Sequence, residues 1–194
     1  MLVLASASPR RRELLAAAGI ACTVRPAEGV DETPLPDEMP ETYVQRLAEA
    51  KALAVAAETG EVVLGADTVV VIDGRILGKP ADEREAAAML AALAGRCHEV
   101  VTGICLRLGG RLVRDLAVTR VWFGELTAGD ITEYVAGGEP LDKAGAYAIQ
   151  GIAARFIERI DGSYSNVVGL PVALVWQRLR EAGVDAPAAG RKPG

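Results

Sequence analysis

The chain has 194 residues, 51% of them hydrophobic and 24% charged, which is the balance of a globular protein able to bury a sizeable core. Its formal net charge of −5 at pH 7 argues against broad nucleic-acid binding, although a small anion can still bind in a local basic pocket. Aromatic residues make up only 4%, so we expect an aliphatic, alanine-rich core.

Nothing in the sequence predicts a membrane span or an export signal. No stretch reaches the ~20 apolar residues that a spanning helix needs, and the start MLVLAS lacks the charged region of a secretory signal. Three cysteines, Cys22, Cys97 and Cys105, form no CxxC pair, which indicates reduced structural thiols. We therefore expect a cytoplasmic protein with neither a membrane nor a nucleic acid as partner.

Hydrophobic periodicity and turn signals predict alternating strands and helices along the chain. Ser8 and Pro9 mark a helix start, as N-cap and first helical residue, and Gly19 marks its end. Gly109-Gly110 indicates a hairpin. The expected strands cover 2–5, 21–24, 61–72, 100–108, 111–123 and 156–160, and the expected helices cover 9–19, 41–59, 82–94, 127–136 and 171–182.

This order predicts a mixed α/β fold in which helices cover a twisted sheet. No internal repeat or linker interrupts it, so residues 1–184 are interpreted as one domain. Residues 28–40 form an acidic, proline-rich loop. The tail 185–194, DAPAAGRKPG, is predicted to be disordered.

Three consecutive arginines, Arg10, Arg11 and Arg12, lie in the first turn of the first expected helix. The helix dipole and the unpaired N–H groups of that turn favour an anion there, not three cations. A bound phosphate would resolve the conflict, and a solvated basic turn paired with Glu13 is the alternative. Arg10 and Arg11 need not both be ligands, because the helix directs them differently.

Asp67 lies inside the apolar run EVVLGADTVVVI, and Lys51 lies on the apolar stripe of the 41–59 helix. A buried, unpaired carboxylate costs several kcal/mol, so Asp67 indicates a metal, catalysis or a fixed partner. Gly65 and Ala66 leave space for another group to approach it. Lys51 either extends its ammonium to solvent or reaches a phosphate through apolar packing.

Other polar residues give weaker signals. Lys79 in the loop Gly78-Lys79-Pro80 carries little information by itself, and Asp31-Glu32 in the acidic loop could hold a metal, with a solvated loop as the default interpretation. The stretch AGAYAIQG, near Asp142, Lys143 and Gln150, either meets a flat ligand or simply turns. His98, the sole histidine, precedes an expected strand and is predicted to be structural.

The common nucleotide and hydrolase motifs are absent: there is no GxxxxGK[ST], GxGxxG, HExxH or GxSxG pattern. A nucleotide enzyme built on this chain would bind phosphates through separate cations and a helix end. From the residues alone, the prediction is a mixed α/β enzyme that acts on a phosphate-containing ligand and depends on an acidic residue.

The chain resembles the Maf-like family of nucleoside triphosphate pyrophosphatases. The segments that carry the resemblance occur in family order along nearly the whole chain: LASASPRRRELL at 4–15, VDE at 30–32, GADTVV at 65–70, GKP at 78–80, LAGRCHEVVTG at 93–103, EPLDKAGAYAIQG at 139–151 and IDGSYSNVVGLP at 160–171. The resemblance implies an elongated, twisted central sheet, two lobes with a cleft between them, and cleavage between the α and β phosphates.

The resemblance also implies roles for residues. The general base would be Asp67, and substrate choice would depend on Arg10, Thr68 and Gln150. Other cleft positions fall on Ser6, Arg11, Glu32, Lys51 and Lys79. Thr68 and the Gln150-Gly151 ending are similar to the branch active on dTTP and UTP, and unlike the sister branch active on 7-methyl-GTP.

The expected reaction is hydrolysis of dTTP or UTP to the monophosphate and pyrophosphate. Mg²⁺ or Mn²⁺ would be held by Glu32 and Asp67. Alternatives are a nucleotide-sensing division regulator without turnover, the same reaction on another nucleotide, and a phosphatase that removes only the γ phosphate. The family resemblance also implies a homodimer.

Overall fold

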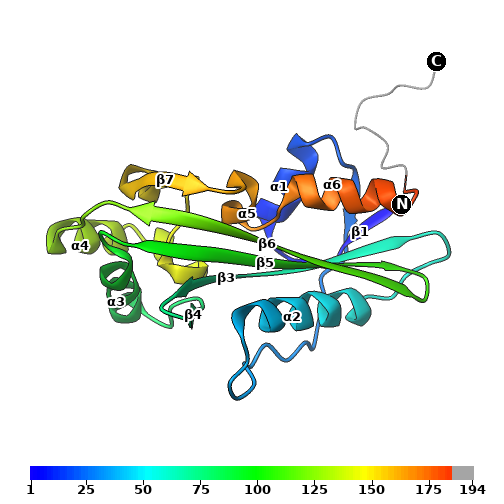
Figure 1. Ribbon diagram of the computed structural model, residues 1–194, viewed down its shortest axis with the longest axis horizontal. Coiled ribbons are helices and arrows are strands. Elements are labelled where there is room, and N and C mark those ends of the chain that lie inside the picture. Colours follow the sequence, from blue (N-terminus) through cyan, green and yellow to red (C-terminus); the bar gives the residue numbers. More distant parts are fainter. Residues whose placement is uncertain (185–194) are drawn as a thin grey trace. The chain divides into compact units, whose positions relative to one another are not determined.

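The computed structural model describes residues 1–184, so the tail predicted to be disordered lies outside the described residues (Figure 1). The seven strands form one sheet with the order β2-β1-β3-β5-β6-β7, and β4 pairs with β3. The strands are β1 (Leu2–Leu4), β2 (Cys22–Val24), β3 (Val62–Ile72), β4 (Arg75–Leu77), β5 (Cys97–Leu108), β6 (Arg111–Phe123) and β7 (Ile157–Asp161). The expected mixed α/β sheet is confirmed.

Six α-helices and three short 3-10 helices connect these strands within the described residues. The α-helices are α1 (Pro9–Ala17), α2 (Pro40–Ala54), α3 (Glu83–Leu93), α4 (Ala128–Ala136), α5 (Tyr164–Val168) and α6 (Val172–Glu181). The 3-10 helices are η1 (Glu139–Asp142), η2 (Ala144–Ala146) and η3 (Ile152–Phe156).

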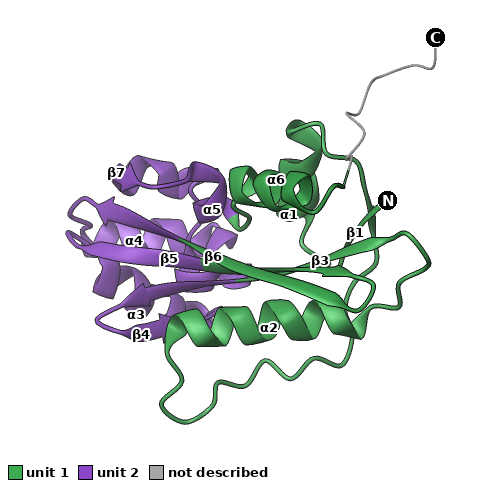
Figure 2. Ribbon diagram, turned by 45° about the vertical axis from the view of Figure 1, so that its right-hand side comes forward, with its two compact units in different colours: residues 1–67, 102–117, 169–194 green, residues 68–101, 118–168 purple. Residues whose placement is uncertain are grey.

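The chain forms two compact units, which Figure 2 colours green and purple. Of the described residues, unit 1 comprises 1–67, 102–117 and 169–184, and unit 2 comprises 68–101 and 118–168. The boundary at residues 67 and 68 separates Asp67 from Thr68. Two units agree with the two lobes that the resemblance implies, and the cleft stays a prediction.

Unit 1 is built on parallel strands. Leu2 of β1 pairs with Cys22 of β2 on one side and with Val62 of β3 on the other. Its core is aliphatic, as expected: Leu4 and Leu64 are fully buried with Leu15 of α1 and Leu179 of α6. Ser8 caps α1 by accepting a hydrogen bond from the N–H of Arg11, and Pro9 is the first helical residue, as predicted.

Helix α2 contacts the main chain of two strands at glycines. A Cβ at Gly65 of β3 would lie 2.0 Å from the carbonyl oxygen of Ala48, and one at Gly103 of β5 would lie 2.5 Å from that of Val44. Such distances are far inside van der Waals contact, so only glycine allows the helix this close. The space that Gly65 leaves beside Asp67 is therefore filled by α2 itself.

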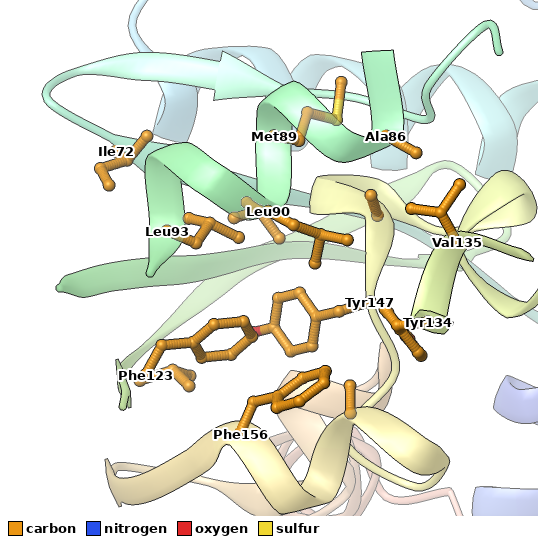
Figure 3. Close-up of a cluster of buried hydrophobic side chains, with 14 of the residues drawn as sticks. Ile72, Ala86, Met89, Leu90, Leu93, Phe123, Tyr134, Val135, Tyr147 and Phe156 are labelled. Atoms are coloured by element: carbon orange, nitrogen blue, oxygen red, sulfur yellow. The ribbon is translucent and has the colours of Figure 1, made fainter. Parts of the chain in front are cut away.

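Unit 2 has an aromatic core, which corrects the expectation of an aliphatic core throughout. Figure 3 shows Phe123, Tyr134, Tyr147 and Phe156 gathered beside the buried aliphatic side chains of α3. Phe123 and Tyr147 meet edge to face with ring centroids 4.8 Å apart, and Tyr134 and Phe156 do so at 5.5 Å. The low overall aromatic content concealed this concentration in one unit.

Helix α2 ends at Ala54, five residues before the predicted end. Val55 is extended, with φ −89° and ψ 128°. The guanidinium of Arg107 donates hydrogen bonds to the carbonyl oxygens of Leu53 and Val55, at 3.1 and 2.5 Å. Carbonyl groups at a helix end need partners from outside the helix, and this distant partner could not be predicted from local sequence.

His98 is a structural residue, as predicted. It is 2% exposed, lies edge to face with Phe123 and Tyr147, and its Nε2 is 2.8 Å from the Tyr147 hydroxyl. Its Nδ1 is buried without a hydrogen-bond partner among the described residues. Burial lowers the pKa of His98 to about 4, so the imidazole stays neutral across the physiological range.

We predict that Gly65→Ala destabilises the protein by about 3 kcal/mol, because a rigid helix backbone must move to admit the new methyl group. Urea unfolding at pH 7 measures the change. Gly110→Ala is the matched control, since a Cβ there meets nothing within 4 Å. Equal unfolding midpoints for the two variants would contradict the close approach of α2.

We predict that His98 makes the protein less stable in acid. The unfolded state takes up a proton at the ordinary pKa of 6.5, whereas the folded state resists protonation until about pH 4. Stability contributed above pH 6.5 is therefore lost as the pH falls towards 4. Between pH 7 and pH 5, wild type should lose about 2 kcal/mol more than His98→Gln in urea unfolding. Parallel losses in both proteins would refute this assignment.

Candidate active site

Asp67 and Lys51 form an ion pair in unit 1. Asp67 lies in β3 and is 8% exposed, and the Lys51 ammonium on α2 donates to its Oδ1 at 2.6 Å. The same ammonium is 2.6 Å from Oε1 of Glu32, whose side chain is 58% exposed. Two carboxylates therefore converge on one cation. The prediction that Lys51 lies on the apolar stripe is confirmed, since Leu47 and Val55 beside it are buried.

Arg11 is the buried member of the three arginines. Its Nε donates to the Gly169 carbonyl oxygen at 2.8 Å, and its Nη1 donates to the Ser6 hydroxyl at 3.0 Å. Arg10 is partly exposed and Arg12 is exposed, which confirms that the helix directs Arg10 and Arg11 differently. Arg11 and Ser6 thus form a hydrogen-bonded polar pair, and both residues are buried.

Electrostatics couple these groups. Burial raises the pKa of Asp67, an effect that the Lys51 and Arg11 charges oppose and that Glu32 reinforces. Burial lowers the pKa of the Arg11 guanidinium, and the charge of Asp67 acts against that shift. A buried carboxylate with a raised pKa and defined charge partners is typical of a catalytic acid or base.

Tyr43 and Arg46 of α2 also contact the site, and the sequence did not reveal either. The Tyr43 hydroxyl donates to the Glu32 carbonyl oxygen at 2.8 Å, and Arg46 Nη2 donates to the Thr33 carbonyl oxygen at 3.1 Å. Tyr43 is eight residues before Lys51 and hence on the same helix face. That spacing is the one local signal that could have linked it to the site.

Three predicted site residues belong to unit 2. Thr68 is partly exposed in β3, while Lys79 and Gln150 are exposed in segments outside helices and strands. The Gly145 N–H donates to the Gly78 carbonyl oxygen at 3.0 Å, which joins the loop of Lys79 to η2, the 3-10 helix that precedes the Gln150 turn.

The residues that follow Gln150 contact the carboxylate of Glu139. Glu139 accepts hydrogen bonds from the Tyr134 hydroxyl at 2.7 Å and from the Ile152 N–H at 3.1 Å. A Cβ at Gly151 would lie 2.3 Å from that carboxylate. Lys143 donates to the Glu139 carbonyl oxygen at 2.7 Å and to Asp142 at 2.5 Å, so Asp142 and Lys143 have structural contacts of their own.

Glu32 and Asp67 are the carboxylates placed to hold a divalent metal ion. No group of three or more His, Cys, Asp or Glu side chains arranged to bind a metal occurs in residues 1–184. Mg²⁺, however, is commonly bound by one or two carboxylates together with substrate phosphates. The Lys51 ammonium already marks a point where the oxygens of Glu32 and Asp67 meet a cation. The residues present therefore fit a metal whose remaining ligands come from a phosphate-containing ligand and water.

The fold and this site define a class: a mixed α/β protein with paired carboxylates and a buried arginine, suited to a phosphorylated ligand. A sequence model described as "Maf-like protein" matches residues 1–182. The chain belongs to the Maf-like family.

Relatives in three genera are similar over nearly their whole length. The dTTP/UTP pyrophosphatase of Anaeromyxobacter dehalogenans (strain 2CP-C) is 54% identical, covering 96% of each chain. The proteins of that name from Koribacter versatilis and Geobacter metallireducens are 50% and 53% identical. Each covers 94% of this chain, which matches 95% and 96% of their own lengths.

The remaining sequence expectations concern thiols and membranes. Cys22, Cys97 and Cys105 are all free, as predicted. Among the described residues, none of the helices has the length and apolar character needed to cross a bilayer.

Proposed function

We propose that this protein hydrolyses dTTP and UTP to the nucleoside monophosphate and pyrophosphate, with a divalent metal ion. The observation that carries the proposal is the convergence of Asp67 and Glu32 on Lys51, beside the buried Arg11. The names of the relatives, which share half of its residues, support the substrates. We further propose a cytoplasmic homodimer that removes unwanted nucleotides from the pool.

Asp67 is the group that takes a proton from the attacking water. Its carboxylate lies on a buried strand and is paired with Lys51 while no nucleotide is bound, and burial raises its pKa above the ordinary value, which favours proton uptake. When bound, Mg²⁺ or Mn²⁺ would be held by Asp67 and Glu32 and would supply charge neutralisation to the phosphates.

The cations stabilise the negative charge of the phosphates during in-line displacement. Arg11 and Lys51 serve this role from unit 1, with Ser6 as a hydrogen-bonding neighbour of Arg11. Arg10 and Lys79 add charge. Thr68 and Gln150 can each donate and accept hydrogen bonds, which suits the imide edge of thymine or uracil.

The Lys51 ammonium can pair with the two carboxylates or with nucleotide phosphates, but not with both at once. While its ammonium lies 2.6 Å from both carboxylates, a metal ion must compete with it for the same oxygens. Nucleotide phosphates offer the ammonium another partner and so release the carboxylates. Metal and nucleotide binding should therefore be cooperative.

We predict that Lys51→Met binds Mn²⁺ about tenfold more tightly than wild type when no nucleotide is present, because the competing cation is gone; tenfold is about 1.4 kcal/mol. Its affinity for a non-hydrolysable dTTP analogue should fall. Electron paramagnetic resonance of unbound Mn²⁺ at pH 8 measures the first quantity. Weaker or unchanged Mn²⁺ binding would show that Lys51 does not compete at these carboxylates.

We predict that Asp67→Asn lowers kcat by at least about a hundredfold, because general bases contribute about 10²- to 10⁴-fold. Pyrophosphate release from dTTP and UTP with Mg²⁺ measures the loss, and circular dichroism reports the fold. Asp73→Asn, at an exposed turn residue, is the control and should retain full activity. More than a tenth of the wild-type rate in Asp67→Asn would exclude Asp67 as the base.

A panel of common and modified nucleoside triphosphates tests the proposal against its alternatives, with pyrophosphate and orthophosphate read separately. Pyrophosphate from dTTP and UTP supports the proposed reaction. Orthophosphate alone identifies a γ-phosphatase, and pyrophosphate chiefly from 7-methyl-GTP identifies the other branch. Nucleotide binding without either product favours a sensor.

A further inference from the structure

Glu32 is held near Lys51 by something other than burial. It lies in the segment between β2 and α2, where residues 25–39 contain neither helix nor strand. Its side chain is 58% exposed, whereas those of Lys51 and Asp67 are 13% and 12% exposed. A carboxylate on such a loop would sample many positions unless its main chain were tied down.

Tyr43 supplies that tie. Its hydroxyl donates to the carbonyl oxygen of Glu32 itself at 2.8 Å. Tyr43 is 8% exposed. Burial, followed by the charges of Asp67 and Glu32, raises the pKa of Tyr43 to about 12, so the hydroxyl remains a donor throughout the neutral range.

Arg46 supplies a second tie one turn further along α2. Its guanidinium donates to the Thr33 carbonyl oxygen at 3.1 Å and to both oxygens of Glu38 at 2.7 Å. It also lies over the Tyr43 ring, 5.5 Å from the centroid. On the loop itself, the Thr33 N–H donates to Asp31 at 2.9 Å. Thr33, which follows Glu32, is therefore held to α2, and Asp31 is tied to Thr33.

Two residues on one face of α2 contact different parts of Glu32. Tyr43 and Lys51 are two turns apart, with the buried Leu47 between them. Tyr43 contacts the Glu32 main chain, and Lys51 contacts its carboxylate. Both contacts come from α2, so the helix that carries Lys51 also sets the position of the Glu32 carboxylate.

We propose that Tyr43 is a positioning residue for the pyrophosphatase reaction: its hydroxyl fixes the main chain at Glu32 so that the carboxylate stays opposite Lys51 and Asp67. This inference rests on the proposed function, since it concerns the second carboxylate of that site. The Tyr43 hydroxyl and the Tyr43 ring thereby have separate roles. The ring packs in the core of unit 1, whereas the hydroxyl serves the loop.

The test compares Tyr43→Phe with wild type. Phenylalanine keeps the buried ring and removes only the donor. We expect kcat/KM for dTTP to fall about tenfold at limiting Mg²⁺, a loss in line with one hydrogen bond to an ordered loop. Tyr164→Phe is the matched control, because Tyr164 is 48% exposed, and it should match wild type. Equal losses in the two variants would overturn the proposal.

A double-mutant cycle separates positioning from general weakening of the fold. Glu32→Gln removes the carboxylate that Tyr43 is proposed to place. If Tyr43 acts through Glu32, adding Tyr43→Phe to Glu32→Gln should lower kcat/KM by no more than about twofold further. A full additional tenfold loss in the double variant would mean that Tyr43 acts elsewhere, and the proposal would fail.

Hydrogen exchange gives a readout independent of turnover. Peptides covering 31–38 include the Thr33 and Leu35 N–H groups, which donate to Asp31 and Glu38. We expect them to exchange at least about threefold faster in Tyr43→Phe than in wild type. Unchanged exchange would overturn the proposal even if activity fell. If wild type releases no pyrophosphate but Tyr43→Phe still exchanges faster than wild type, the Tyr43 tie is supported and the proposed function is refuted.

Discussion

The candidate site of unit 1 depends on the main-chain contact between α2 and strands β3 and β5. Gly65 and Gly103 allow the helix backbone to lie where any side chain would collide with it. Asp67 is two residues beyond Gly65, and Lys51 is one turn beyond Ala48, which contacts Gly65. A side chain at Gly65 would push the helix away from the strand, and with it Lys51 from the 2.6 Å contact with Asp67.

That close approach concentrates charge in a poorly solvated place. Asp67, Lys51 and Arg11 are all largely buried, and burial shifts the pKa of Asp67 and Arg11 towards their neutral forms. Buried ion pairs seldom add net stability compared with apolar packing. The proposed function accounts for these buried charges, because a base with a raised pKa and cations near phosphate act most strongly where water is scarce. The apolar cores of both units offset the cost.

The features that could be predicted from the sequence are those that depend on residues close together in the chain. Ser8, Pro9 and the Gly109-Gly110 turn mark real element boundaries, and the conflict of Asp67 with its apolar surroundings correctly indicated a buried, partnered acid. The end of α2, the strand β4, the 3-10 helices and the Tyr43 contact were missed. Each depends on hydrogen bonds between residues distant in sequence or on very short segments, and periodicity carries no information about either.

The two units divide the candidate residues by the kind of element that carries them. In unit 1, Asp67 and Lys51 stand on a strand and a helix in direct main-chain contact, which suits groups whose distances must hold within tenths of an ångström. In unit 2, Lys79 and Gln150 stand on loops linked by one hydrogen bond from Gly145 to Gly78 and tied through Glu139. Loops accept substitution more readily than packed elements. Lys79 and Gln150 should therefore tolerate substitution more readily than Asp67 and Lys51 without loss of the fold.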